Sequence, residues 1–297
     1  MTQTRYERGH EFLAFLPTIG QDLPYSMTLL RDLFDMTSDK SLASMPEMAR
    51  TLGQDQGLTA KVLAMANSAF YGLQSRVSTL PRALALLGVR EIRQLVLVLG
   101  VQSICSRRTL PHAFDLHAYW KHQLQVAAVC KELGHLARAA GQPALDIDLL
   151  YTTGLLHDLG KLLTALHRPQ DWDAMEKLRQ DEGLPAFAAE DRYWGLEHGV
   201  VGAITLNSWN IPQELTEPVN WHHVPELAKE WQPQATILCL ADALCHALEQ
   251  DEAEPAPPAP HVLACLKRLG LELAPAWALA RERFHDERLE EMATLLQ

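Results

Sequence analysis

The chain has 297 residues, of which 47% are hydrophobic, so it is long enough for one large or two modest hydrophobic cores. Its 37 acidic and 26 basic residues give a net charge of -11, which argues against general electrostatic binding of nucleic acid. Mixed polar residues open the chain and no uncharged apolar run reaches the ~18 residues of a membrane span, so we expect a cytoplasmic protein without membrane contact.

Apolar residues at helical spacing predict an all-α protein, and strand signals are weak throughout. After a short helix and a turn in residues 1–25, we expect helical segments over 27–34, 42–52, 58–69, 83–87 and 92–101. A long amphipathic helix is predicted over 119–140, because Gly141 and Pro143 follow it as stop signals. Further helices are predicted over 198–209, 215–221 and 235–248.

The most informative stretch, residues 155–162, reads Leu-Leu-His-Asp-Leu-Gly-Lys-Leu. We predict that it lies in a helix over about 148–167 that continues through Met175 and Leu178. A buried charge is costly unless it is paired, hydrogen-bonded or bound to a metal. Neighbouring helical side chains diverge by roughly 100°, so His157 and Asp158 cannot face each other, but both can reach one ion between them.

Seven residues in predicted helices or at helix ends offer nitrogen or oxygen ligands: His122, His157, Asp158, His198, His222, His223 and Asp242. No cysteine joins this set, which excludes a thiolate zinc site and favours one or two divalent ions of Fe, Mn, Zn or Mg. If Asp158 bridges two ions roughly 3.5 to 4 Å apart, the pair can activate a water and clamp a phosphoryl group. Lys161 is either a snorkelling cation or a phosphate contact.

Each of these residues also has a structural interpretation, since a single histidine on an apolar helix is usually a core or surface residue. The five cysteines form no Cys-x-x-Cys pair and are interpreted as reduced core thiols. The remaining histidines are interpreted as structural or exposed: His10, His112, His117, His135, His167, His246, His261 and His285.

The residues 62–71, with the sequence VLAMANSAFY, together with Val77, 82–88 and 90–93, resemble the HDOD family of all-helical bacterial signalling modules. The resemblance covers about residues 20–250 and implies a multi-helix HDOD bundle related to the HD superfamily. We therefore expect an N-terminal helical half over 1–110 and an HD-like half over 111–250. An acidic, proline-rich linker over 251–260 would follow, and then a C-terminal extension of one or two helices over 261–297.

The HD superfamily pattern implies metal binding by a first histidine, a His-Asp doublet and a distant aspartate, which correspond here to His122, His157, Asp158 and Asp242. The remaining three predicted ligands, His198, His222 and His223, resemble the extra ligands of two-metal members. Val-Pro-Glu follows His223, where the HD-GYP branch has a Gly-Tyr-Pro motif. This difference argues against cleavage of cyclic di-GMP.

Two functions stay open. The first is a regulatory, signal-transducing HDOD protein that binds a signalling protein or a small phosphorylated ligand. The second is a metal-dependent phosphohydrolase of a nucleotide or another phosphate ester, with Asp158 and Lys161 as its catalytic residues. Residues 261–297 either pack against the body of the protein or contact a partner, which includes a second copy in a homodimer.

Overall fold

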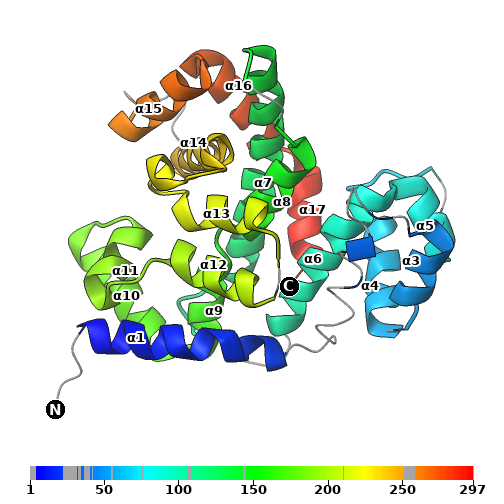
Figure 1. Cartoon of the computed structure of the whole chain (residues 1–297), viewed down its shortest axis with the longest axis horizontal. Coiled ribbons are helices and arrows are strands. Elements are labelled where there is room, and N and C mark those ends of the chain that lie inside the picture. The colour runs from blue at the N-terminus through cyan, green and yellow to red at the C-terminus, as the bar shows by residue number, and fades with distance from the viewer. Residues whose placement is uncertain are drawn as a thin grey trace. The chain divides into compact units, whose positions relative to one another are not determined.

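The computed structural model describes residues 5–22, 32, 35–36, 41, 43–54, 56–74, 76–105, 109–142, 145–209, 211–250 and 258–296. Within these ranges all regular structure is helical and there is no strand, which confirms the predicted all-α fold (Figure 1). None of the helices in this part of the chain combines the length and apolar character needed to cross a membrane. The chain divides into two compact units, formed by residues 1–17 with 110–286 and by 18–109 with 287–297.

The smaller unit is built from helices of the N-terminal half and the last helix of the chain. Its α-helices are α3 (Met45–Leu52), α4 (Gln56–Ala66), α5 (Leu80–Leu87), α6 (Val89–Cys105) and α17 (Glu287–Leu295). The side-chain amide of Asn67, just after α4, donates to the carbonyls of Leu63 and Val77, and its oxygen accepts from the Val77 amide. Asn67 therefore joins the end of α4 to the segment at Val77 by hydrogen bonds to the backbone.

The larger unit contains the predicted His-Asp doublet. It begins with α1 (Arg5–Phe15) and continues with α7 (Leu116–Ala139), α8 (Ile147–Leu156), α9 (Leu159–His167), α10 (Pro169–Glu182) and α11 (Ala186–Trp194). The rest comprises α12 (His198–Ser208), α13 (Gln213–Trp221), α14 (Gln232–Glu249), α15 (Pro260–Leu269) and α16 (Leu273–Phe284). Asp115 and Asp146 cap the N-termini of α7 and α8 by accepting hydrogen bonds from backbone amides.

The core of the larger unit joins α7, α8, α14, α15 and α16 through buried apolar residues such as Leu133, Leu150, Leu240 and Leu266. Helices α7 and α8 cross closely at one point, where a Cβ on Gly154 would lie 2.6 Å from Ala127 Cα. Only a glycine fits at this crossing without displacing α7. His157, directly after the end of α8, lies beside His122 of α7, with the ring centroids 5.3 Å apart.

Two of the helix predictions are wrong. The helix predicted over 148–167 and beyond is interrupted at residues 157–158, and a new helix starts at Pro169. Pro169 has no amide hydrogen and restricts the residue before it, so Arg168 leaves the helical conformation. Residues 261–297 contain parts of three helices where one or two were expected.

Some predictions fall on residues outside the described ranges. They include most of the helical segment over 27–34 and residues 251–257 of the predicted linker. The predicted domain boundaries stay a prediction. The four cysteines whose side chains are described, Cys130, Cys239, Cys245 and Cys265, are buried free thiols, as interpreted from the sequence.

Candidate metal centre

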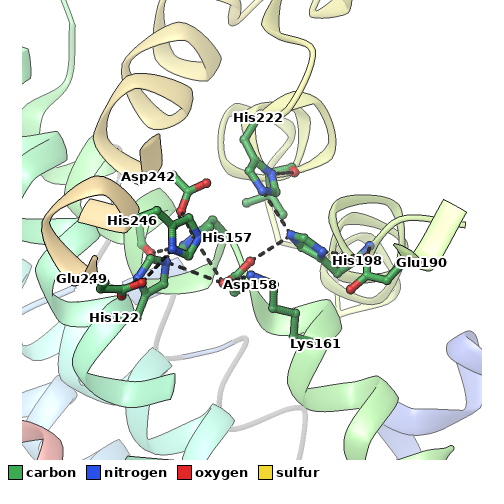
Figure 2. A network of polar contacts seen from close by, with 12 residues as sticks. His122, His157, Asp158, Lys161, Glu190, His198, His222, Asp242, His246 and Glu249 are labelled. Carbon is green, nitrogen blue, oxygen red and sulfur yellow. Dashed lines mark hydrogen bonds and ion pairs between the residues drawn. The ribbon is translucent and has the colours of Figure 1, made fainter. Parts of the chain in front are cut away.

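Polar side chains from several helices of the larger unit converge on one point in its interior (Figure 2). His122 comes from the first half of α7 and Asp242 from α14, while His198 is the first residue of α12. His157 and His222 lie just past the ends of α8 and α13. These residues and Asp158 are all buried or nearly so, with side-chain exposures between 0% for His157 and 13% for Asp242.

Asp158 lies between two groups of imidazoles (Figure 2). Its Oδ2 atom is 3.4 Å from His157 Nε2 and 3.8 Å from His122 Nε2. Its Oδ1 atom is 2.9 Å from His198 Nε2 on the other side. This is the position that a bridging carboxylate would need, because each of its oxygens faces a different set of nitrogens.

The imidazoles share one orientation, which their hydrogen-bond partners fix. His157 Nδ1 donates to the carbonyl of Gly154 at 2.8 Å, and His222 Nδ1 donates to that of Val219 at 2.7 Å. Carbonyl oxygens only accept, so these bonds require a hydrogen on Nδ1 and turn Nε2 toward the centre. His198 and His122 repeat the pattern with the carboxylates of Glu190 and Glu249, each at 2.8 Å. Histidines that bind metals typically donate their second ring nitrogen in this way.

Two atoms at the centre show that the donor set fits a cation. His157 Nε2 and Asp158 Oδ1 are buried and have no hydrogen-bond partner within the described part of the chain. His198 Nε2 lies within 2.9 Å of Asp158 Oδ1, but the two groups are not aligned for a hydrogen bond. A buried polar atom without a partner costs roughly 1–3 kcal/mol, and a divalent cation would satisfy both atoms at once.

The seven predicted ligands lie in three groups, two of which share His122. One group contains His122, His157 and Asp158, and another contains His198, His222 and His223. Asp242 joins His122 in a third group, with Oδ1 at 3.1 Å from His122 Nε2 and 3.6 Å from His157 Nε2. The residue types are imidazole and carboxylate throughout, a donor set suited to Zn, Mn or Fe.

The charges of the cluster shift the pKa values of its members in opposite directions. Burial alone would lower the pKa of His122, but the hydrogen bonds that its ring nitrogens donate to Asp242 and Glu249 outweigh burial and raise the pKa to about 9. Burial would raise the pKa of Asp158, but the charges of His157, Lys161 and His198 hold it well below its ordinary value. In the metal-free protein Asp158 is therefore ionised and a proton on His122 balances part of the negative charge.

The pKa values of His222 and His223, which follow α13, shift in the opposite direction from that of His122. Burial, followed by the charges of neighbouring imidazoles, lowers the pKa values of His222 and His223 well below the ordinary value. These two imidazoles are therefore neutral at pH 7, the form in which histidine binds metal ions. His223 lies at the edge of the cluster, where its ring stacks on Phe187 with the centroids 4.5 Å apart.

The centre opens into a cavity of about 520 Å³. Lys161, His198, His222, His223 and Asp242 contribute its polar wall. Lys161 also approaches the centre, because its Nζ atom lies 2.6 Å from Asp158 Oδ2. Apolar side chains from α11, α15 and α16 also line the cavity, among them Phe187, Val262, Leu273 and Trp277.

Three residues of this cluster were missed from the sequence: Glu190, His246 and Glu249. The side chain of His246 is 45% exposed, in agreement with its interpretation as structural or exposed, and its Nε2 atom lies 3.3 Å from Asp242 Oδ1. The spacing Asp242, His246, Glu249 places all three on one face of α14, which is a signal that the sequence contained. No comparable local signal marks Glu190, which lies on a separate helix from its partner His198.

Known proteins resemble the chain over most of its length. A crystal structure of a candidate phosphohydrolase from Shewanella amazonensis SB2B matches with a TM-score of 0.73 and 22% identity, over 96% of this chain and 98% of that one. A candidate signal transduction protein from Marinobacter aquaeolei VT8 matches with a TM-score of 0.76 and 18% identity, over 99% of this chain and 67% of that one. At sequence identities of 22% and 18%, the similarity to these two structures establishes the fold alone.

The chain also resembles known proteins in sequence. An uncharacterised protein of Treponema pallidum (strain Nichols) is 24% identical over 205 residues, which are 68% of this chain and 38% of that relative. The chain thus spans well under half the length of this relative. The family model of the HDOD domain matches residues 23–225, which include six of the seven predicted ligands. Since this match covers more than half of the sequence and the fold agrees with it, the chain belongs to the HDOD domain family.

Proposed function

We propose that this chain is a bacterial regulatory protein that uses a divalent-metal centre to bind a small phosphorylated ligand. The observation that supports the proposal most strongly is the common orientation of four buried imidazoles. His122, His157, His198 and His222 each donate Nδ1–H to an oxygen, and three of their Nε2 atoms lie within 3.8 Å of Asp158. Packing alone gives no reason for such convergence around a carboxylate.

The residues divide into two ligand sets around Asp158. His122, His157 and Asp242 would hold one ion on the Oδ2 side, and His198, His222 and His223 would hold a second on the Oδ1 side. Glu190 and Glu249 keep the imidazoles in the tautomer that presents Nε2. A bound divalent cation supplies Lewis acidity toward phosphate oxygens.

The cavity beside the centre supports a phosphorylated ligand. Lys161 is the cation of its polar wall, and its Nζ atom is already close to Asp158. An ammonium group at this distance neutralises the carboxylate in the metal-free protein and contacts an anionic ligand after metal has taken its place. The apolar side chains that line the same cavity would contact the rest of the ligand.

Metal content of the purified protein tests the proposal directly. Elemental analysis should find near-stoichiometric metal in the wild type, and much less in Asp158→Asn. His135→Ala is the matched control, because His135 is an exposed residue of the same helix as His122. Circular dichroism checks that each variant is folded. If all three proteins stay empty after incubation with Mn²⁺, Fe²⁺ or Zn²⁺, the centre is structural and the proposal is wrong.

A second candidate function is hydrolysis of a phosphate ester. The opening of Lys161, His198 and His222 into one cavity favours it, because a substrate there would contact both the cationic group and the ligand sets. The manganese-loaded protein would then release nitrophenol from p-nitrophenyl phosphate or its diester, and Asp158→Asn would not. Phosphate binding measured by calorimetry without any turnover would support the regulatory function instead.

A regulatory protein also needs a receiver of its signal, and we propose a signalling protein in that role. Ligand binding next to α14, α15 and α16 would alter the surface that these helices present. Comparison of hydrogen exchange with and without inorganic phosphate, on the metal-loaded protein, tests this coupling. Protection confined to the cavity walls would contradict a transmitted change.

A further inference from the structure

Helix α14 carries an imidazole beside the centre, that of His246, which belongs to neither of the proposed ligand sets. Asp242, His246 and Glu249 follow each other at helical spacing, so they share one face of α14. The ring of His246 stacks on the ring of His122, with centroids 4.5 Å apart and planes 19° from parallel (Figure 2). Two imidazoles from different helices thus lie side by side next to Asp242.

Two carboxylates hold this imidazole pair from opposite sides. Glu249 Oε1 and Oε2 lie 2.8 Å from Nδ1 of His122 and 2.8 Å from Nδ1 of His246. An ionised carboxylate only accepts, so both Nδ1 atoms donate and both Nε2 atoms face the other way. There, Asp242 Oδ1 lies 3.1 Å from Nε2 of His122 and 3.3 Å from Nε2 of His246. Ligands that share an ion at ~2.1 Å lie roughly 3.0–3.4 Å apart, so the spacing fits one ion.

One imidazole nitrogen binds one ion, so the ion on His122 Nε2 is also the ion that His157 would bind. We propose that His246 is an additional, exchangeable ligand of this ion and that Glu249 is a positioning residue for both imidazoles. The inference rests on the proposed function, since it requires a metal-loaded centre. It adds a residue outside the His-Asp pattern and assigns that residue a role in controlling access.

Exposure indicates why His246 is the ligand that can exchange. Its side chain is 45% exposed, whereas those of His122 and His157 are 8% and 0% exposed. His246 and Asp242 line the cavity, so a ligand that enters from the cavity meets the ion on the His246 side. A phosphate oxygen can therefore replace His246 without displacing a buried ligand. The ligand class is an oxyanion, and self-coordination by His246 competes with it.

Cobalt(II) as the metal probe gives a readout of coordination that does not depend on activity. Removal of a ligand should change the visible absorption of bound Co²⁺ in His246→Ala and weaken Co²⁺ binding roughly 10-fold or more. Glu249→Gln should weaken binding by about 10- to 100-fold, as removal of an outer hydrogen-bond partner does. His135→Ala should match the wild type. Imidazole added to His246→Gly should restore the wild-type spectrum, which a merely structural role would not produce.

Inorganic phosphate tests the exchange step. It should shift the spectrum of the cobalt-loaded wild type toward that of His246→Ala, and the variant should bind phosphate more tightly although it binds the metal more weakly. A wild-type spectrum and wild-type Co²⁺ affinity in His246→Ala would overturn this inference alone. If Co²⁺ binding in the wild type is no stronger than in Asp158→Asn, the proposed function fails and this inference fails with it.

Discussion

The substitution Gly160→Ala tests how the two ligand sets are held together. A Cβ on Gly160 would lie 2.0 Å from the carbonyl oxygen of His198, and 2.7 Å from its carbonyl carbon. Both are backbone atoms, so no side-chain rotation removes the clash. Ordinary contact begins at 3.4 Å, so α9 and α12 must separate by about 1.4 Å.

Separation of these helices acts directly on the centre. Asp158 precedes α9 and His198 begins α12, so the distance of 2.9 Å between Asp158 Oδ1 and His198 Nε2 would grow to about 4.3 Å. Two ligands of one ion lie at most roughly 4.2 Å apart. We expect a loss of metal at the His198 side and a decrease of ~1–3 kcal/mol in the free energy of unfolding, the usual cost of overpacking.

Urea unfolding of the metal-free protein and titration with Mn²⁺ measure the two effects. Gly183→Ala is the matched control, because Gly183 ends α10 with φ 64° and has no atom near its Cβ position. Alanine there should lower stability by ~1 kcal/mol through backbone strain but leave metal binding unchanged. Wild-type metal stoichiometry together with an unfolding free energy within ~0.5 kcal/mol of wild type in Gly160→Ala would refute the reasoning.

Three further predictions concern charge and the cavity. In the metal-free protein, the pKa of His122 is about 9 against an ordinary 6.5, so the residue contributes about 3 kcal/mol of stability that is fully present below pH 6.5 and is lost as the pH rises through about 9. The difference in urea unfolding between wild type and His122→Ala should therefore shrink between about pH 6 and pH 10, and a constant difference would contradict this. Lys161→Met removes the cation 2.6 Å from Asp158, so Mn²⁺ should bind more tightly and the metal-free protein should be less stable. Exposed Lys177→Met should change neither, and weaker Mn²⁺ binding in Lys161→Met would show that Lys161 does not compete with metal. Trp277→Ala should weaken binding of phenyl phosphate by roughly 10-fold or more without affecting inorganic phosphate, because Trp277 lines the apolar wall. Equal losses in calorimetric titrations of both ligands would contradict an apolar contact.

Helix positions followed from apolar periodicity where stop signals were present. The helix predicted over 119–140 is α7, Leu116–Ala139, and the segments around Gly88 are α5 and α6. The break at residues 157–158 has no glycine or proline to mark it. There, His157 donates its side-chain Nδ1–H to the carbonyl of Gly154, and the chain turns before α9 begins. Pro169, in contrast, was a visible signal for the second break.

The types of residue at the centre could be predicted from the sequence, but the orientation of the imidazole rings could be predicted only in part. His157 and His222 each follow directly after a helix and donate to the carbonyl three residues earlier. Helix ends leave such carbonyls without partners, so a histidine at this position fixes its own tautomer locally.

His122 and His198 lie within a helix or at its start, and their Nδ1 atoms need a carboxylate from elsewhere in the chain. Glu249 and Glu190 supply these carboxylates through packing of α14 on α7 and of α11 near α12. Two of the four imidazoles are thus oriented by their own helix ends and two by tertiary contacts. Substitution of Glu190 or Glu249 should therefore weaken metal binding. The ends of α8 and α13 should still hold His157 and His222 in place. Loss of metal ligation at one imidazole therefore need not mean collapse of the centre.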